Sequence, residues 1–188
     1  MKHLLLTSLS IASVILLTGC TLYQPGMEQI ENNNISSPTT KLNEEQVTQL
    51  NYLIEEEKLA HDVYTTLGEK RNNKQFINIP KSEAQHKSLM TQLLQKYSIT
   101  DPTQDSIGAF SDPELTELYH TLLTQGKQSP QEAIKVGIAI EQKDIADIEK
   151  ILPSFINYPD IQAVLNKLLQ GSRNHLKAFE KGVSSAGN

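Results

Sequence analysis

The sequence predicts an all-α fold in which four long helices form a bundle and a long crossover, containing a short helix, joins the second helix to the third. Apolar residues recur at steps of three and four in four separate segments, and that spacing places them on one face of a helix. About 30 residues separate the second segment from the third, which is too many for a tight turn and suits a crossover. The third helix is therefore expected to run parallel to the second.

The first two helices are placed by their start signals and their apolar stripes. The first is expected to begin after Asn43, which acts as the N-cap, with Gln46 completing a capping box. It is expected to run to about Lys70, before "RNNK". The second follows "INIP" and is expected from about Lys81 to Tyr97.

The last two helices have equally clear boundaries. Ser129 caps the third, which begins "SPQE" and is expected to reach about Leu152, before a proline. The fourth is expected from about Pro159 to about Lys181, where Gly182 is a stop signal. The short helix of the crossover is expected within "SDPELTELYHTLLTQG".

The N-terminal segment predicts export and a lipid anchor. Residues 1–19 have a basic start, an apolar run and small residues, and their end, "LTGC", resembles a bacterial lipobox. Lipidated Cys20 would be the membrane contact, residues 20–41 a flexible tether, 42–183 the helical domain and 184–188 a tail. The expected location is therefore the bacterial cell envelope, outside the cytoplasm. The net charge of −5, with no basic stripe, argues against nucleic acid as a partner.

Each predicted stripe contains an acid or a histidine at a position that should be dry. A buried, unpaired charge costs several kcal/mol, and ionised carboxylates cannot neutralise one another. One or two divalent cations would bind them all and remove the penalty. Carboxylate and imidazole ligands suit iron or manganese, with zinc as an alternative, and helical bundles build two-metal sites with Glu-x-x-His on one helix. The candidate metal ligands are Glu57, Glu83, His86, Glu141, Asp144 and His175.

Five segments together resemble the DUF2202 family of ferritin-like domains: "EEEKLAHDVY", "SEAQH", "IGAF", "GIAIEQKDI" and "GSRNHLKAF". The likeness covers about residues 44–181 and implies a ferritin-like four-helix fold with a two-metal, carboxylate–histidine site, more than it implies a reaction. One departure is that "SRNH" gives Ser172 and His175 where the usual fourth helix repeats Glu-x-x-His. Either Asp144 replaces the missing ligand, or it is a solvated acid and five ligands remain.

Three functions follow from these residues. The first is iron oxidation or the reduction of dioxygen or peroxide at two iron ions, with Glu57 and Glu141 bridging them and an external electron donor, because the chain has no CxxC pair. The second is a non-catalytic metal-binding or structural envelope lipoprotein. The third is a metal-free scaffold whose acids pair with Lys143 or Arg173.

Polar residues beside the stripes have separate expectations. Glu55 and Glu56 face away from the first stripe and are expected in solvent, and His120 is expected on the surface of the crossover helix. His61 borders the stripe and is a candidate for contact with a metal ligand. Tyr64 either hydrogen-bonds a ligand or belongs to the apolar core.

Overall fold

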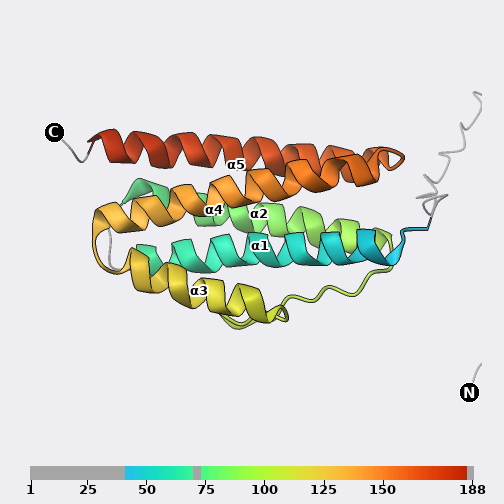
Figure 1. Ribbon diagram of the computed structural model, residues 1–188, viewed down its shortest axis with the longest axis horizontal. Coiled ribbons are helices and arrows are strands. Elements are labelled where there is room, and N and C mark those ends of the chain that lie inside the picture. Colours follow the sequence, from blue (N-terminus) through green and yellow to red (C-terminus); the bar gives the residue numbers. More distant parts are fainter. Residues whose placement is uncertain (1–40, 70–72, 186–188) are drawn as a thin grey trace, which may run out of the picture. The chain divides into compact units, whose positions relative to one another are not determined.

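The computed structural model describes residues 41–69 and 73–185, and within them every regular element is helical (Figure 1). The prediction of an all-α fold is therefore confirmed. Cys20 and the segment that resembles a lipobox lie outside the described residues. No helix of the described part combines the length and the apolar character needed to cross a membrane. The elements are α1 (Glu44–Gly68), α2 (Lys74–Lys96), α3 (Pro113–Gly126), α4 (Pro130–Ile151), the short 3₁₀ helix η1 (Leu152–Phe155) and α5 (Pro159–Ser185).

The direction of the helices follows from the pairs of residues that meet. Tyr64 of α1 contacts Gly137 of α4, and Glu56 of α1 contacts Lys143, so α1 and α4 run antiparallel. The successive helices α1 and α2 also run antiparallel, as do α4 and α5 (Figure 1). The helices α2 and α4 consequently run in the same direction, as expected from the crossover between them, which contains α3.

The predicted caps of the first and third long helices are present. The side chain of Asn43 accepts a hydrogen bond from the Gln46 backbone N–H, and the Gln46 side chain accepts one from the Asn43 backbone N–H, which completes the capping box. Ser129 accepts a hydrogen bond from the N–H of Glu132 and so caps α4. Each cap satisfies backbone donors that a helix start leaves without intrahelical partners.

The expected start of the second long helix, at about Lys81, is wrong. The helix α2 begins at Lys74, capped by Asn73, and continues through Pro80. A proline inside a helix removes one backbone hydrogen bond. The early turns persist because they bury two large side chains, Phe76 and Ile79, in the core, so tertiary packing outweighs the local cost.

The stop signal at Gly182 is also wrong, because α5 continues to Ser185. Gly182 does not end the helix; it allows neighbouring side chains to pack closely against α5. A Cβ atom on residue 182 would lie 3.0 Å from Nε2 of Gln75 and 3.3 Å from Cδ1 of Ile134. The small residue therefore lets the end of α5 lie close to α2 and α4.

The hydrophobic core is divided into two clusters along the bundle. One contains the N-terminal part of α1, the C-terminal parts of α2 and α4 and the first half of α5, and the other contains the opposite halves together with α3. On each of the four long helices, the inward-facing side chains midway between these clusters are polar. This middle zone, which we call the polar layer, contains Glu57, Glu83, His86, Glu141, Asp144, Ser172 and His175.

Candidate metal centre

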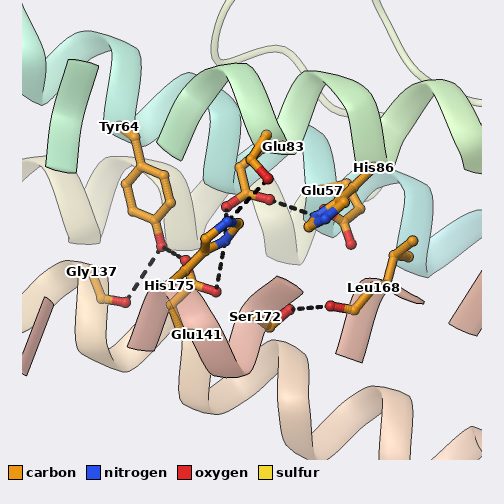
Figure 2. Close-up of polar contacts among 10 residues, drawn as sticks. Glu57, Tyr64, Glu83, His86, Gly137, Glu141, Leu168, Ser172 and His175 are labelled. Carbon is orange, nitrogen blue, oxygen red and sulfur yellow. Dashed lines mark hydrogen bonds and ion pairs between the residues drawn. The ribbon is translucent and has the colours of Figure 1, made fainter. Parts of the chain in front are cut away.

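Five of the six predicted metal ligands converge in the polar layer. Figure 2 shows side chains from all four long helices pointing toward one another. Glu57 is 1% exposed and Glu141 is fully buried, so this is the interior of the protein and not a surface cluster. Apolar side chains close the layer on both sides, and burial therefore raises the cost of any charge that has no partner.

The five residues form two sets of three that share one glutamate. In the His86 set, ligand atoms of Glu57, Glu83 and His86 all lie within 4.8 Å of one another, and in the His175 set the same holds for Glu83, Glu141 and His175. The two imidazole rings are stacked, with their centroids 5.5 Å apart. Glu83 therefore occupies the centre, with one histidine on each side.

The distances within each set are those of groups crowded around a common point. In the His86 set, Nδ1 of His86 is 2.9 Å from Oε2 of Glu83 and 3.3 Å from Oε2 of Glu57. In the His175 set, Nδ1 of His175 is 2.8 Å from Oε1 of Glu83 and 3.7 Å from Oε2 of Glu141. Both histidines thus turn the same ring nitrogen, Nδ1, toward the carboxylates (Figure 2).

Several atoms of these residues are buried without a hydrogen-bond partner. They are both carboxylate oxygens of Glu57, Oε1 of Glu83, Oε2 of Glu141 and Nδ1 of His175. Some of them are in ion-pair contact without forming a hydrogen bond, as Nδ1 of His175 is with Oε1 of Glu83 and Oε2 of Glu57 is with Nδ1 of His86. Buried polar atoms in native proteins almost always have a partner, and a bound ion is one of the explanations for an exception. Carboxylate oxygens and imidazole nitrogens are ligands of iron, manganese and zinc. The residues present therefore fit a metal centre.

Electrostatics in the layer favour a cation. Burial raises the pKa of Glu57 to about 7 and that of Glu141 to about 7, against the opposing contacts with His86 and His175. Burial also acts to raise the pKa of Glu83, but its close contacts with both histidines outweigh burial and lower that pKa. Although burial disfavours their charged forms, these carboxylates raise the pKa of His86 to about 9 and that of His175 to about 10. Protons on His86 and His175 therefore neutralise part of the negative charge of these carboxylates, which is the role that a bound metal ion would take.

Two hydroxyl groups orient members of the His175 set. Tyr64 donates a 2.7 Å hydrogen bond to Oε1 of Glu141 (Figure 2). The Tyr64 ring also packs against Phe76 and Phe179, so Tyr64 belongs to the apolar core and at the same time hydrogen-bonds a candidate ligand. On the other side, Oγ of Ser82 lies 3.0 Å from Nε2 of His175.

Two small residues of α5 shape the other side of the layer. A Cβ atom on Gly171 would lie 2.3 Å from Cε1 and 2.5 Å from Nε2 of His86, so the ring occupies space that any side chain would fill. Ser172 is buried, and its hydroxyl donates to the carbonyl of Leu168 on its own helix. Ser172 therefore offers no side-chain group to either set.

The comparison with known proteins agrees with the motifs read from the sequence. The family described as "Uncharacterized protein domain (DUF2202)" matches residues 46–188. The chain belongs to the DUF2202 family. It is 44% identical over 154 residues to the uncharacterized protein MJ0754 of Methanocaldococcus jannaschii, a match that covers 81% of this chain and 83% of that protein.

A solved structure resembles this DUF2202 chain in three dimensions. It is the crystal structure of the hypothetical protein MJ0754 from Methanococcus jannaschii, with a TM-score of 0.77 at 43% sequence identity. The similarity covers 80% of this chain and 86% of the other.

Asp144 lies close to the centre but belongs to neither set of three. Its side chain is buried, so it is not a solvated acid. Burial raises its pKa well above the ordinary value, and the charges of Glu56, Glu141 and Glu57 add to the rise. The structure thus places Asp144 in the polar layer without bringing it into contact distance of a complete ligand set.

The expectation that Glu55 and Glu56 of the DUF2202 chain are in solvent is wrong, because both are buried. Glu55 accepts hydrogen bonds from the backbone N–H groups of Ser111 and Asp112, 2.6 and 3.1 Å away. Glu56 forms an ion pair with Lys143 of α4. These acids are buried because α1 is covered by the crossover and by α4 as well as by α2.

The next charged residues of α1 hold the crossover in place. Lys58 and Asp62 form a buried ion pair. Lys58 also donates to the carbonyl of Ser106, and Asp62 accepts from the N–H of Gly108, each at 2.9 Å. The spacing of Glu55, Lys58 and Asp62 at steps of three and four was the sequence signal for this second buried stripe, which the apolar pattern does not reveal.

The remaining charged candidates lie outside the centre. Nδ1 of His61 is 2.9 Å from a carboxylate oxygen of Asp62 and does not contact a ligand set. His120 is exposed on α3, as expected. Arg173 pairs with Glu149 at the surface. Lys143 pairs with Glu56, outside both ligand sets. Among the described residues, the basic side chains in ion-pair contact with the ligand carboxylates are therefore His86 and His175.

A groove of about 530 Å³ between α2 and α5 reaches the polar layer. It is lined by Ser82, Gln85, His86, Ser88, Leu89, Lys167, Gln170, Gly171 and Asn174. The His86 ring is therefore both a member of a ligand set and part of the groove wall. On another side, between α1 and α4, a pocket of about 510 Å³ reaches Glu56.

Proposed function

We propose that this DUF2202 domain is a ferritin-like protein that binds two transition-metal ions between its four long helices. Iron is the leading candidate, with manganese or zinc as alternatives. The observation that carries the proposal is the pair of ligand sets that share Glu83 and contain buried donor atoms without partners. Two positions joined by a common carboxylate are typical of two-metal carboxylate centres in helical bundles.

We propose other roles for the individual ligands than those expected from the sequence. Because Glu83 belongs to both sets, we infer that it contacts both ions, in place of Glu57 and Glu141 as the shared ligands. Glu57 and His86 then complete one position, and Glu141 and His175 the other. Asp144 remains the proposed sixth ligand, supported by its burial beside these carboxylates.

The proposed activity is iron oxidation coupled to the reduction of dioxygen or peroxide. Two ferrous ions held by these residues would supply one electron each, which together with two protons would reduce one hydrogen peroxide to two waters. The two apolar clusters close the polar layer at its two ends, and the Tyr64 hydroxyl donates a hydrogen bond to Oε1 of Glu141. The sequence contains one cysteine and hence no CxxC pair, so an external donor is proposed to return the electrons.

We further propose that the domain works at the bacterial cell envelope, outside the cytoplasm. The support is the sequence of residues 1–20 alone, with the lipobox-like "LTGC" that ends at Cys20. The membrane is then a partner through the lipid on Cys20. Nucleic acid is not a proposed partner, because the net charge is −5.

The experiment that tests the metal centre is a count of metal per chain. The purified full chain is loaded anaerobically with ferrous iron, desalted and analysed for iron, and two ions per chain are expected. Glu83→Leu should remove most of both, because Glu83 belongs to both sets. Glu117→Leu, which replaces an exposed acid of α3, is the matched control and should retain two. Absence of bound metal in the unmodified chain would refute the proposal.

One observation favours a second function, metal binding without turnover. The hydroxyl of Ser172 donates to the carbonyl of Leu168 on its own helix, at the position where a ligand from the fourth long helix would be expected. The candidate centre therefore lacks one side-chain ligand from α5. On this alternative the loaded protein holds metal but consumes neither dioxygen nor peroxide. Oxygen-electrode and peroxide-depletion measurements on the iron-loaded chain separate the two functions. The metal-free scaffold is disfavoured because Lys143 and Arg173 pair outside the ligand sets.

A further inference from the structure

We propose that the two metal positions are not equivalent: the His175 set retains its ion, whereas the His86 set exchanges its ion through the groove between α2 and α5. This inference rests on the proposed function, namely that both sets bind metal. It concerns how each set is held by its surroundings, which the ligand types alone do not determine.

The ligands of the His175 set are fixed by hydrogen bonds from outside the set. Oγ of Ser82 lies 3.0 Å from Nε2 of His175. With a cation bound at Nδ1, the remaining ring proton would be on Nε2, which would donate it to the Ser82 hydroxyl. Tyr64 donates to Oε1 of Glu141 and leaves Oε2 without a partner. In each case one atom of the ligand is used for orientation and the other points to the centre. Such supporting hydrogen bonds raise metal affinity.

The ligands of the His86 set have no comparable support among the described residues. Both carboxylate oxygens of Glu57 are without a hydrogen-bond partner. The His86 ring is placed against Gly171 by shape, because residue 171 has no side chain, and its bonded partner, Glu83, is a member of the set itself. Packing against Gly171 and stacking on His175 hold the His86 ring, but among the described residues no hydrogen bond from outside the set opposes its rotation away from the ion.

The groove supplies the space into which His86 can move. It has a volume of about 530 Å³ and is lined by both His86 and Gly171. Its wall residues are mostly uncharged and polar, and the charged ones, Lys167 and His86, are both basic, so an anionic chelator can enter it without meeting a carboxylate. The pocket between α1 and α4 is lined by Glu56, which pairs with Lys143, and by no member of either ligand set.

The test follows release of zinc from the full chain, loaded with two equivalents, into an excess of a colorimetric anionic chelator. Two phases of equal amplitude are expected, each one ion per chain, with rates that differ by about tenfold or more. Ser82→Ala should accelerate the slow phase by about 10–100-fold and leave the fast phase unchanged. Ser88→Ala is the matched control, because Ser88 lines the same groove on the same helix without touching a histidine.

A second pair of variants tests the His86 side independently. Gly171→Ala should abolish the fast phase and keep the slow one, because the added Cβ displaces the His86 ring. Gly182→Ala on the same helix is its control and should keep both phases, because its neighbours are Gln75 and Ile134.

A single release rate for both ions, or equal acceleration of both phases by Ser82→Ala, would overturn the inference while leaving a two-metal protein. A chain that binds no zinc, iron or manganese would instead overturn the proposed function, and the inference with it.

Discussion

Replacing Glu57 with leucine should remove one of the two metal ions and yet stabilise the metal-free protein. Burial raises the pKa of Glu57 from its ordinary value of 4.5 to about 7. At 1.36 kcal/mol per pKa unit, the ionised side chain costs the folded state about 3 kcal/mol. Because the folded pKa lies above the unfolded one, this cost is absent well below about pH 4.5 and complete above about pH 7. Leucine of similar size removes it.

The expected gain at about pH 8 is about 1–3 kcal/mol, because local relaxation and the lost contact with His86 reduce the full value. For a domain of this size the melting temperature should rise by about 3–10 °C. At about pH 5 most of the gain should vanish. The same variant, loaded with metal, should keep one ion per chain in the His175 set, since Glu57 belongs only to the His86 set.

The assay is thermal unfolding followed by circular dichroism, on chelator-treated protein at both pH values, together with elemental analysis after loading. The exposed-site control Glu117→Leu should change stability by no more than about 0.5 kcal/mol at either pH. A Glu57→Leu variant that binds two ions would show that Glu57 is not a ligand. A lower melting temperature at about pH 8 would show that its charge is already compensated.

Three further variants test other parts of the structure. Tyr64→Phe should lower the free energy of unfolding by about 1–2 kcal/mol in denaturant titrations and speed release of the retained ion, since Glu141 loses its donor; unchanged release would exclude a positioning role. Asp62→Asn should cost about 3 kcal/mol at neutral pH by breaking a buried ion pair. Because hydrogen bonds outweigh burial and lower the pKa of Asp62, this difference should shrink as the pH falls below about 3.8, and a difference constant with pH would contradict it. Cys20→Ser should shift the protein from the membrane to the soluble fraction, and unchanged fractionation would exclude the lipid anchor.

Much of the fold could be predicted because local signals and tertiary packing agree. The capping box at Asn43 and the cap at Ser129 mark helix starts by satisfying donors within a few residues, and both are present. The start of α2 could not be predicted in this way. Pro80 signals a helix start locally, whereas burial of Phe76, which depends on residues far along the chain, extends the helix.

The candidate site could be predicted to a similar degree. Burying a charged residue within an apolar stripe costs free energy, so the sequence marks Glu57 and Glu141 as candidates for a site. Both side chains are buried in the polar layer. Glu55 and Glu56 were misjudged because a periodicity argument assumes that a helix has one covered face. Asp144 shows the remaining limit, since residue spacing places a side chain on a face without fixing where its carboxyl group ends.

The four consecutive charges of α1, from Glu55 to Lys58, have a consequence for how this domain can change. Their partners lie in different directions around the helix: the crossover, α4, the polar layer and Asp62 with the crossover loop. Successive residues of a helix are turned by about 100° from one another. Inserting or deleting one residue here would therefore point every charge at the wrong neighbour at once. Point substitutions in this segment should each impair one contact, whereas a change of length should prevent the bundle from assembling.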